Sequence, residues 1–191
     1  MERIGLFGGS FNPVHVGHML IAQAAREELG LTHLFFIPAA QSPFKPGVQL
    51  AAASERVRLL RLALAGQTGC SVDEQEIVRG GVSYSIDTAR AYAARFPDRE
   101  LWYVIGADHA RLLPKWREAE ELAKLTRFAV IPRPDQGAVV LPAPFRGQAL
   151  RGWVFDVSAS QIRERIRAGL PIRWLVPPAV EEAIYNNQLY L

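Results

Sequence analysis

The fold is decided by the stretch Gly8-Gly9-Ser10-Phe11-Asn12-Pro13-Val14-His15-Val16-Gly17-His18, which joins a short apolar run to a helical pattern. The run 3–7 is bounded by glycines and is too short for a helix, so it is expected to form a buried strand. Gly8 and Gly9 are expected to form a turn in which main-chain N–H groups can approach a phosphate. Apolar residues recur at helical spacing over 17–29 and Gly30 follows them, which predicts a helix.

Two histidines mark the start of this predicted helix. His18 falls in its first turn and His15 just before it. The free N–H groups and the positive end of the helix dipole favour an anion there, and two imidazoles three residues apart can both face it. Two alternatives remain open: one histidine may cap the helix while the other is only exposed, or the pair may bind zinc. No further Cys or His cluster supplies the remaining zinc ligands.

The motif resembles a known signature. Gly9-Ser10-Phe11-x-Pro13-x-His15-x-Gly17-His18 is similar to the motif of the nucleotidyltransferase superfamily that carries His-x-Gly-His. The resemblance implies transfer of a nucleoside monophosphate from a triphosphate to a phosphate or a phospho-alcohol.

Length and composition fit a globular protein that handles small anions. The chain has 191 residues, 49% of them hydrophobic, and a net charge of +3. No cluster of Lys and Arg with interleaved aromatics indicates nucleic-acid binding, so we expect no nucleic-acid partner. The single cysteine, Cys70, cannot form an internal disulfide, and no apolar run approaches the length of a membrane span. We therefore expect a cytoplasmic protein with no membrane partner; whether it forms a homo-oligomer stays open.

Apolar runs of strand length alternate with helical patterns along the chain. After the first unit, the runs lie at 33–38, 70–77, 101–105, 128–132 and 154–157, and the helical patterns at 52–65, 85–96, 117–125, 158–169 and 179–187. This alternation predicts an α/β fold with a doubly wound parallel sheet and helices on both faces. We expect one domain, 1–191, with a C-terminal helical part from about 158. Ligands of such sheets bind at the carboxyl ends of the strands.

Several candidate residues lie at these predicted ends. Lys45 is the only charge in the long loop 39–50 and could reach β- or γ-phosphates, although it could also be an ordinary surface lysine. Asp108 follows the strand 101–105 and could accept hydrogen bonds from a ribose or cap the next helix. Trp116 could stack on a planar base or fill the edge of the core.

The start of the helix 158–169 is a second candidate anion site. Ser158 and Ser160 are ordinary N-cap residues, but a cap that leaves N–H groups free beside Arg163, one turn further on, is also suited to bind an anion. The segment 133–147 is rich in Pro, Gly and Ala and is expected to be irregular.

Five motifs in register narrow the resemblance. Four further motifs follow the first one along the chain. They are the loop of Lys45, Ser83-Tyr84-Ser85, Ile105-Gly106-Ala107-Asp108 with Leu113-Pro114-Lys115-Trp116, and Ser158-x-Ser160-x-Ile162-Arg163. In this order they resemble the family of bacterial nicotinate mononucleotide adenylyltransferases over nearly the whole chain. The related phosphopantetheine adenylyltransferases typically have Thr at the position of His15 and lack the segments of Tyr84 and Trp116.

The resemblance implies a role for each matching residue. His15 and His18 would contact the ATP phosphates and stabilise charge at the α-phosphate, with Lys45 and Arg163 as further catalytic cations. The turn and the strand end would bind ATP through Gly8, Gly9, Ser10, Phe11, Gly106 and Asp108, and Ser158, Ser160 and Arg163 would hold the triphosphate. Trp116 would stack on the pyridine ring, and the Tyr84-Ser85 segment would bind its carboxylate.

The resemblance also implies the partners of the reaction, which are ATP and nicotinate mononucleotide, with Mg²⁺ held mainly by the ATP phosphates rather than by a metal site of the protein. Phe44 departs from the family pattern, in which a histidine is common, and a phenylalanine ring can make no such hydrogen bond to a phosphate. Two other functions stay open: an adenylyltransferase for phosphopantetheine or another small molecule, and a non-catalytic module that senses nucleotides.

Overall fold

The computed structural model describes residues 2–44, 49–131, 140–153 and 155–191. These residues form a six-stranded sheet whose strands are all parallel and lie in the order β3-β2-β1-β4-β5-β6. The strands are β1 (Arg3–Gly9), β2 (His33–Pro38), β3 (Cys70–Val72), β4 (Glu100–Gly106), β5 (Arg127–Ile131) and β6 (Gly147–Ala149). The doubly wound parallel sheet expected from the sequence is confirmed.

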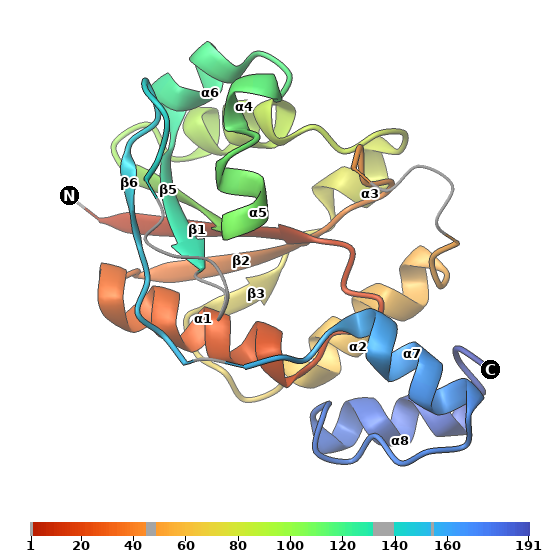
Figure 1. Cartoon of the computed structure of the whole chain (residues 1–191). Coiled ribbons are helices and arrows are strands. Elements are labelled where there is room, and N and C mark those ends of the chain that lie inside the picture. The colour runs from red at the N-terminus through yellow and green to blue at the C-terminus, as the bar shows by residue number, and fades with distance from the viewer. Residues whose placement is uncertain (1, 45–48, 132–139, 154) are drawn as a thin grey trace.

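Helices cover both faces of the sheet. They are α1 (Val16–Leu29), α2 (Ala53–Ala63), α3 (Gln75–Arg79), α4 (Ser85–Arg95), α5 (Ala107–Ala110), the 3-10 turn Leu113–Lys115, α6 (Ala119–Leu125), α7 (Ala159–Arg167) and α8 (Pro178–Asn186). Figure 1 shows α1 and α2 below the sheet and α4, α5 and α6 above it. Within the part of the chain that the structure describes, no helix is long and apolar enough to cross a bilayer.

Each central strand contributes side chains to two apolar clusters, one on each face. On β2, Leu34 and Phe36 belong to the cluster beneath the sheet, and Phe35 and Ile37 to the cluster above it. This alternation is the two-residue period of a strand buried on both faces, and it explains why the run 33–38 contains almost no polar residue. Each such side chain contributes about 1.5–3 kcal/mol by leaving water.

The strand order creates a crevice at one end of the sheet. From β1 the chain passes to β2 and β3 on one side and then returns to β4 on the other, so β1 and β4 are neighbours at the point where the order reverses. The connections after these two strands diverge to opposite faces, which opens a space outside their carboxyl ends.

The turn after β1 differs from the sequence expectation. Gly8 and Gly9 continue the strand and pair with Ile37 and Pro38 of β2 rather than forming the turn. The residue in the left-handed conformation is Phe11, with φ at 44°. This backbone conformation is unfavourable for a residue with a side chain, and burial of the Phe11 ring in the lower cluster offsets its cost.

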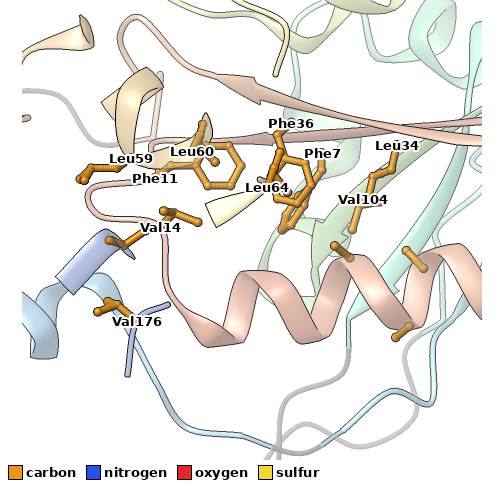
Figure 2. Close-up of a cluster of buried hydrophobic side chains, with 14 of the residues drawn as sticks. Phe7, Phe11, Val14, Leu34, Phe36, Leu59, Leu60, Leu64, Val104 and Val176 are labelled. Carbon is orange, nitrogen blue, oxygen red and sulfur yellow. The ribbon is translucent and has the colours of Figure 1, made fainter. Parts of the chain in front are cut away.

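Figure 2 shows this cluster: side chains of the central strands face α1, and Phe11 and Val14 from the turn lie beside Leu59 and Leu60 of α2. The turn is therefore held in place by apolar contacts with two helices, rather than by its own backbone pairing.

Two predicted strands were wrong in part. The run 70–77 forms a strand only over Cys70–Val72, and Gln75–Arg79 is the short helix α3. The described residues of 154–157 form no strand, because Phe155 instead packs against α1 at Gly17. The sixth strand is Gly147–Ala149, which begins at the last residue of the tract expected to be irregular and was not predicted; a Cβ on Gly147 would lie 1.9 Å from the Phe128 carbonyl oxygen.

The C-terminal helices pack next to the carboxyl ends of the strands. Val176, Val180 and Ile184 belong to the same apolar cluster as the central strands, and Figure 1 shows α7 and α8 beyond the start of α1. Because this part shares its core with the sheet, we propose that 1–191 is one domain.

A buried arginine ties together the loops around the crevice. Arg56 is 2% exposed and lies on the same face of α2 as Leu60, four residues further on. Its Nη1 donates hydrogen bonds to the carbonyl oxygens of Ser10 and Ala39, both at 2.8 Å, and its Nε donates to the Ala51 carbonyl oxygen at 3.1 Å. One guanidinium thus connects the segments that follow β1 and β2 to the start of α2.

Arg56→Met is expected to lower the free energy of unfolding by about 3 kcal/mol or more, because buried carbonyl groups lose their donors at about 1–3 kcal/mol each. Chemical denaturation measures the change. The control is Arg58→Met on the same helix, since Arg58 is partly exposed and, among the described residues, forms its ion pair with Glu55 near the surface; its loss should cost about 1 kcal/mol or less. Equal costs for the two variants would contradict this role of Arg56.

Candidate active site

A cavity of about 190 Å³ lies in the crevice between β1 and β4. Its floor is formed by the ends of these strands, and its walls come from the loop after β2, the α3–α4 connection and the segment after β4. Its lining includes Gly8, Gly9, Ser10, Phe44, Glu76, Ser83, Ser85, Tyr103, Gly106, His109 and Trp116. The cavity is therefore at the position that the strand order predicts for a ligand.

His15 and His18 lie side by side at the start of α1, as the sequence predicted. His15 is the N-cap residue, and the two ring centroids are 3.7 Å apart with 36° between the planes. The backbone N–H of His15 donates a hydrogen bond to Nδ1 of His18 at 3.1 Å. An acceptor nitrogen carries no proton, so this bond assigns the proton of the neutral His18 ring to Nε2.

His15 is neutral at physiological pH. Its side chain is buried, and desolvation lowers the pKa of the imidazole to about 4. The ring can therefore act as a hydrogen-bond donor but not as a cation. This refines the expectation that both histidines compensate phosphate charge, since His15 can do so only through an N–H dipole.

The glycine between the two histidines is required by packing. A Cβ on Gly17 would lie 3.0 Å from the His15 ring and 2.5 Å from Cε2 of Phe155. Any side chain at this position would therefore push the His15 ring or Phe155 out of place. The sequence identified Gly17 as the first residue of the helix and as part of the His-x-Gly-His motif, but gave it no packing role.

The wall that is expected to hold a pyridine carboxylate lies at the start of α4. Tyr84 is the N-cap residue of this helix, and the guanidinium of Arg117 lies 4.7 Å from the centre of its ring. Ser85 lines the cavity, and its hydroxyl is hydrogen-bonded to the buried Tyr103 phenol, whose pKa burial raises. The first backbone N–H groups of α4 are thus close to a cavity wall.

Three aromatic rings form the opposite wall. The Phe44 ring lies 4.9 Å from His109 and 5.5 Å from Trp116, centroid to centroid, and His109 and Trp116 are 6.1 Å apart. Phe44 was expected only to lose a phosphate contact. The structure shows that it contributes a ring to the cavity beside Trp116.

The two residues expected at the end of β4 occupy different places. Gly106 is the last residue of the strand and lines the cavity. Asp108 lies in the first turn of α5, is exposed and is not among the residues that line the cavity. Lys45, the remaining predicted cation of this region, lies outside the described residues.

The start of α7 contacts the turn after β1 from the other side. The Arg163 Nη1 donates to the Asn12 carbonyl oxygen at 2.7 Å and its Nη2 to Ser160 Oγ at 3.1 Å. Ser158 is the N-cap, and its Oγ accepts a hydrogen bond from the Gln161 N–H at 3.2 Å. None of these three predicted residues is among those that line the cavity, and Arg163 is the one that contacts the turn leading to His15.

Sequence reasoning missed two buried charged residues, Arg56 and Glu76. Arg56 had a detectable signal, because it interrupts the apolar face of the predicted helix 52–65. Glu76 had none, since the run around it was taken as a strand. Among the described residues, no group of three or more His, Cys, Asp or Glu is placed to hold a metal ion.

His15 is expected to titrate near pH 4, well below the ordinary histidine value, and NMR chemical shifts of its ring measure this directly. Because the folded pKa is depressed, protonation favours the unfolded chain. The contribution to stability is complete above pH 6.5 and is lost as the pH falls toward 4, by about 3 kcal/mol at most. In a His15→Gln variant, the free energy of unfolding should lack this loss between pH 6.5 and 4. A His15 pKa near 6.5 in the folded protein would be inconsistent with a buried neutral ring.

The comparisons with known proteins agree with this geometry. A family model described as Cytidylyltransferase-like matches residues 6–165. A probable nicotinate-nucleotide adenylyltransferase from Herpetosiphon aurantiacus is 39% identical over the full length of both chains. Another, from Gemmatimonas aurantiaca, is 40% identical over 98% of this chain and 92% of its own.

Among solved structures, the Plasmodium falciparum nicotinic acid mononucleotide adenylyltransferase complexed with NaAD has a TM-score of 0.80. The match covers 100% of this chain and 98% of that one at 15% identity, which supports the fold alone. A putative nicotinate-nucleotide adenylyltransferase from Vibrio parahaemolyticus has a TM-score of 0.74 at 17% identity, with 100% and 96% of the chains covered. The extent and identity of the curated matches place the chain in the nicotinate-nucleotide adenylyltransferase family of cytidylyltransferase-like enzymes.

Proposed function

We propose that the protein transfers AMP from ATP to nicotinate mononucleotide, forming nicotinate adenine dinucleotide and pyrophosphate, a step of NAD biosynthesis. An oxygen of the mononucleotide phosphate forms a bond to the α-phosphorus of ATP, and the bond from that phosphorus to the bridging oxygen of the β-phosphate breaks. The observation that carries the proposal is the paired imidazoles at the start of α1. Neither ring lines the cavity at the reversal of strand order, but the His18 ring lies 5.9 Å from that of Phe7, which does. The named activity of the full-length relatives supports the proposal.

The protein's part in this reaction is alignment and stabilisation of charge. A phosphate oxygen is already a nucleophile at neutral pH, so no general base is needed. The hydrogen bond from the His15 backbone leaves the proton of neutral His18 on Nε2, which can donate to an oxygen of the α-phosphate as negative charge develops there. His15 contributes a second neutral ring beside it.

The triphosphate would extend from these rings toward α7. Arg163 adjoins the turn through the Asn12 carbonyl, and a guanidinium there can also bind phosphate oxygens. Ser158 and Ser160 would support it at the helix start, and Lys45 is proposed as a further cation from the loop after β2. Gly8, Gly9, Ser10, Phe11, Gly106 and Asp108 would line the nucleotide.

Mg²⁺ is proposed to accompany ATP. The described residues offer no cluster of ligands for it, so the ion would be held by phosphate oxygens and water, and would reduce the charge on the leaving pyrophosphate. The pyridine end of the second substrate is proposed to occupy the cavity, which Trp116 and Ser85 line. Trp116 would be the stacking ring, and the Tyr84-Ser85 segment would contact the carboxylate.

His18→Ala is expected to lower kcat by about 10²–10³, the usual effect of losing one donor to a developing oxyanion, while the melting temperature stays within a few degrees. Pyrophosphate release with ATP, Mg²⁺ and nicotinate mononucleotide measures kcat. Nicotinamide mononucleotide and phosphopantetheine in the same assay separate the proposed substrate from the alternatives.

The matched control is His33→Ala, because His33 lies at the opposite end of the sheet, where it is hydrogen-bonded to Ser71. This variant should keep the wild-type kcat. Near-normal turnover of His18→Ala would refute the role of His18, and no pyrophosphate release by the wild type with any of the three acceptors would refute the proposed function.

A further inference from the structure

We propose that Glu76 is the counter-charge for the cationic ring of the pyridine mononucleotide. In an N-ribosylated pyridine the ring nitrogen is quaternary, so the ring is positive whether its substituent is an acid or an amide. The inference rests on the proposed function and deepens it: it assigns a residue that selects for a pyridinium ring, apart from the contacts that recognise the ring's substituent.

The position of Glu76 is the first observation. The side chain comes from α3, is 4% exposed and lines the cavity. A carboxylate is expensive to bury, so a chain retains one where it binds something. Its hydrogen-bond partners Thr88 and Ser83 are neutral hydroxyl groups, and Arg79 acts on the carboxyl group only as a nearby charge.

The hydrogen bonds hold Glu76 as an acceptor. Thr88 Oγ1 donates to its Oε1 at 2.6 Å, and Ser83 is also hydrogen-bonded to the carboxyl group. Ser83 Oγ already accepts a bond from the Ala40 N–H at 2.9 Å, so its own proton is available to Glu76. Burial raises the pKa of the Glu76 carboxyl, while both hydroxyls and the nearby Arg79 favour the ionised form.

The charge balance of the cavity is the second observation. Of the described residues that line it, Glu76 is the only one with a formal charge at neutral pH when histidine is neutral. Arg79, the last residue of α3, and Asp73, two residues before this helix, act on Glu76 with opposite signs. A cation that enters this cavity therefore meets an attractive potential, strengthened because the surroundings are largely apolar.

The aromatic wall is the third observation. Phe44, His109 and Trp116 present a cluster of rings to the same cavity. A flat cation is attracted to such faces by the ring quadrupoles as well as by stacking, and an aromatic enclosure with a carboxylate is a common arrangement for quaternary nitrogen. In this arrangement Phe44 acts on the pyridinium rather than on a phosphate.

The test compares two ligands that differ only in ring charge. One is nicotinate mononucleotide; the other is the corresponding 3-carboxyphenyl C-ribonucleotide, in which carbon replaces the ring nitrogen and the ring is neutral. Calorimetry gives both dissociation constants for the wild type and for Glu76→Gln, which keeps the shape and an acceptor for Thr88. Glu74→Gln is the control, since Glu74 pairs with Arg61 at the surface of the same region.

The wild type is expected to bind the pyridinium ligand about tenfold or more tightly than the neutral one. Glu76→Gln should reduce this ratio at least about threefold, through weaker pyridinium binding, without changing the KM for ATP or the melting temperature. Glu74→Gln should behave as the wild type.

If the wild type binds the neutral and the pyridinium ligand with nearly equal dissociation constants, that result alone would overturn the proposal. An unchanged ratio in Glu76→Gln, or equal weakening of both ligands, would also overturn it, the latter indicating a purely structural residue. If the wild type binds neither ligand, the proposed function itself fails, which is a distinguishable result.

Discussion

The hydrogen bond from the His15 backbone N–H to Nδ1 of His18 is the contact on which the account of this site depends. It ends the turn after β1, begins α1 and fixes which nitrogen of His18 carries its proton. The His15 ring and Phe155 leave no space for a side chain at Gly17, and burial keeps His15 neutral. The His-x-Gly-His pattern therefore satisfies a packing requirement as well as supplying ligands. Two imidazoles lie side by side at a helix start, and the backbone N–H of His15 occupies Nδ1 of His18.

The rest of the structure holds this turn in place. Arg56, on α2, donates a hydrogen bond to the Ser10 carbonyl, and Arg163, on α7, donates one to the Asn12 carbonyl. Two guanidinium groups from distant parts of the chain thus hold two residues of the same turn. The buried Phe11 ring adds an apolar anchor. Such multiple restraint is what precise alignment of two phosphates requires, since misplacement by about 1 Å can cost a factor of 10² in rate.

Much of the fold could be predicted because its strands are buried on both faces and its helices are amphipathic. The errors came where long-range packing overrides local pattern: Phe155 packs on α1 instead of pairing in the sheet, and the strand at Gly147 has no apolar signature at all. In the candidate site, too, the residues that depend on long-range contacts were the ones missed. The placement of His15 and His18 at the start of a helix could be predicted from a contiguous motif. Glu76 and Arg56 instead contact partners 12 and 46 residues away in sequence, and no local pattern specifies those contacts.

The central claim is that the paired imidazoles align ATP for direct attack by the second nucleotide and form no bond to phosphorus themselves. The stereochemical course at the α-phosphorus tests it most directly. With a single diastereomer of adenosine 5′-O-(1-thiotriphosphate) as donor, one in-line displacement predicts inversion in the dinucleotide product. Retention would require two displacements through an adenylyl-enzyme intermediate, most simply on His15 or His18, and would contradict the account.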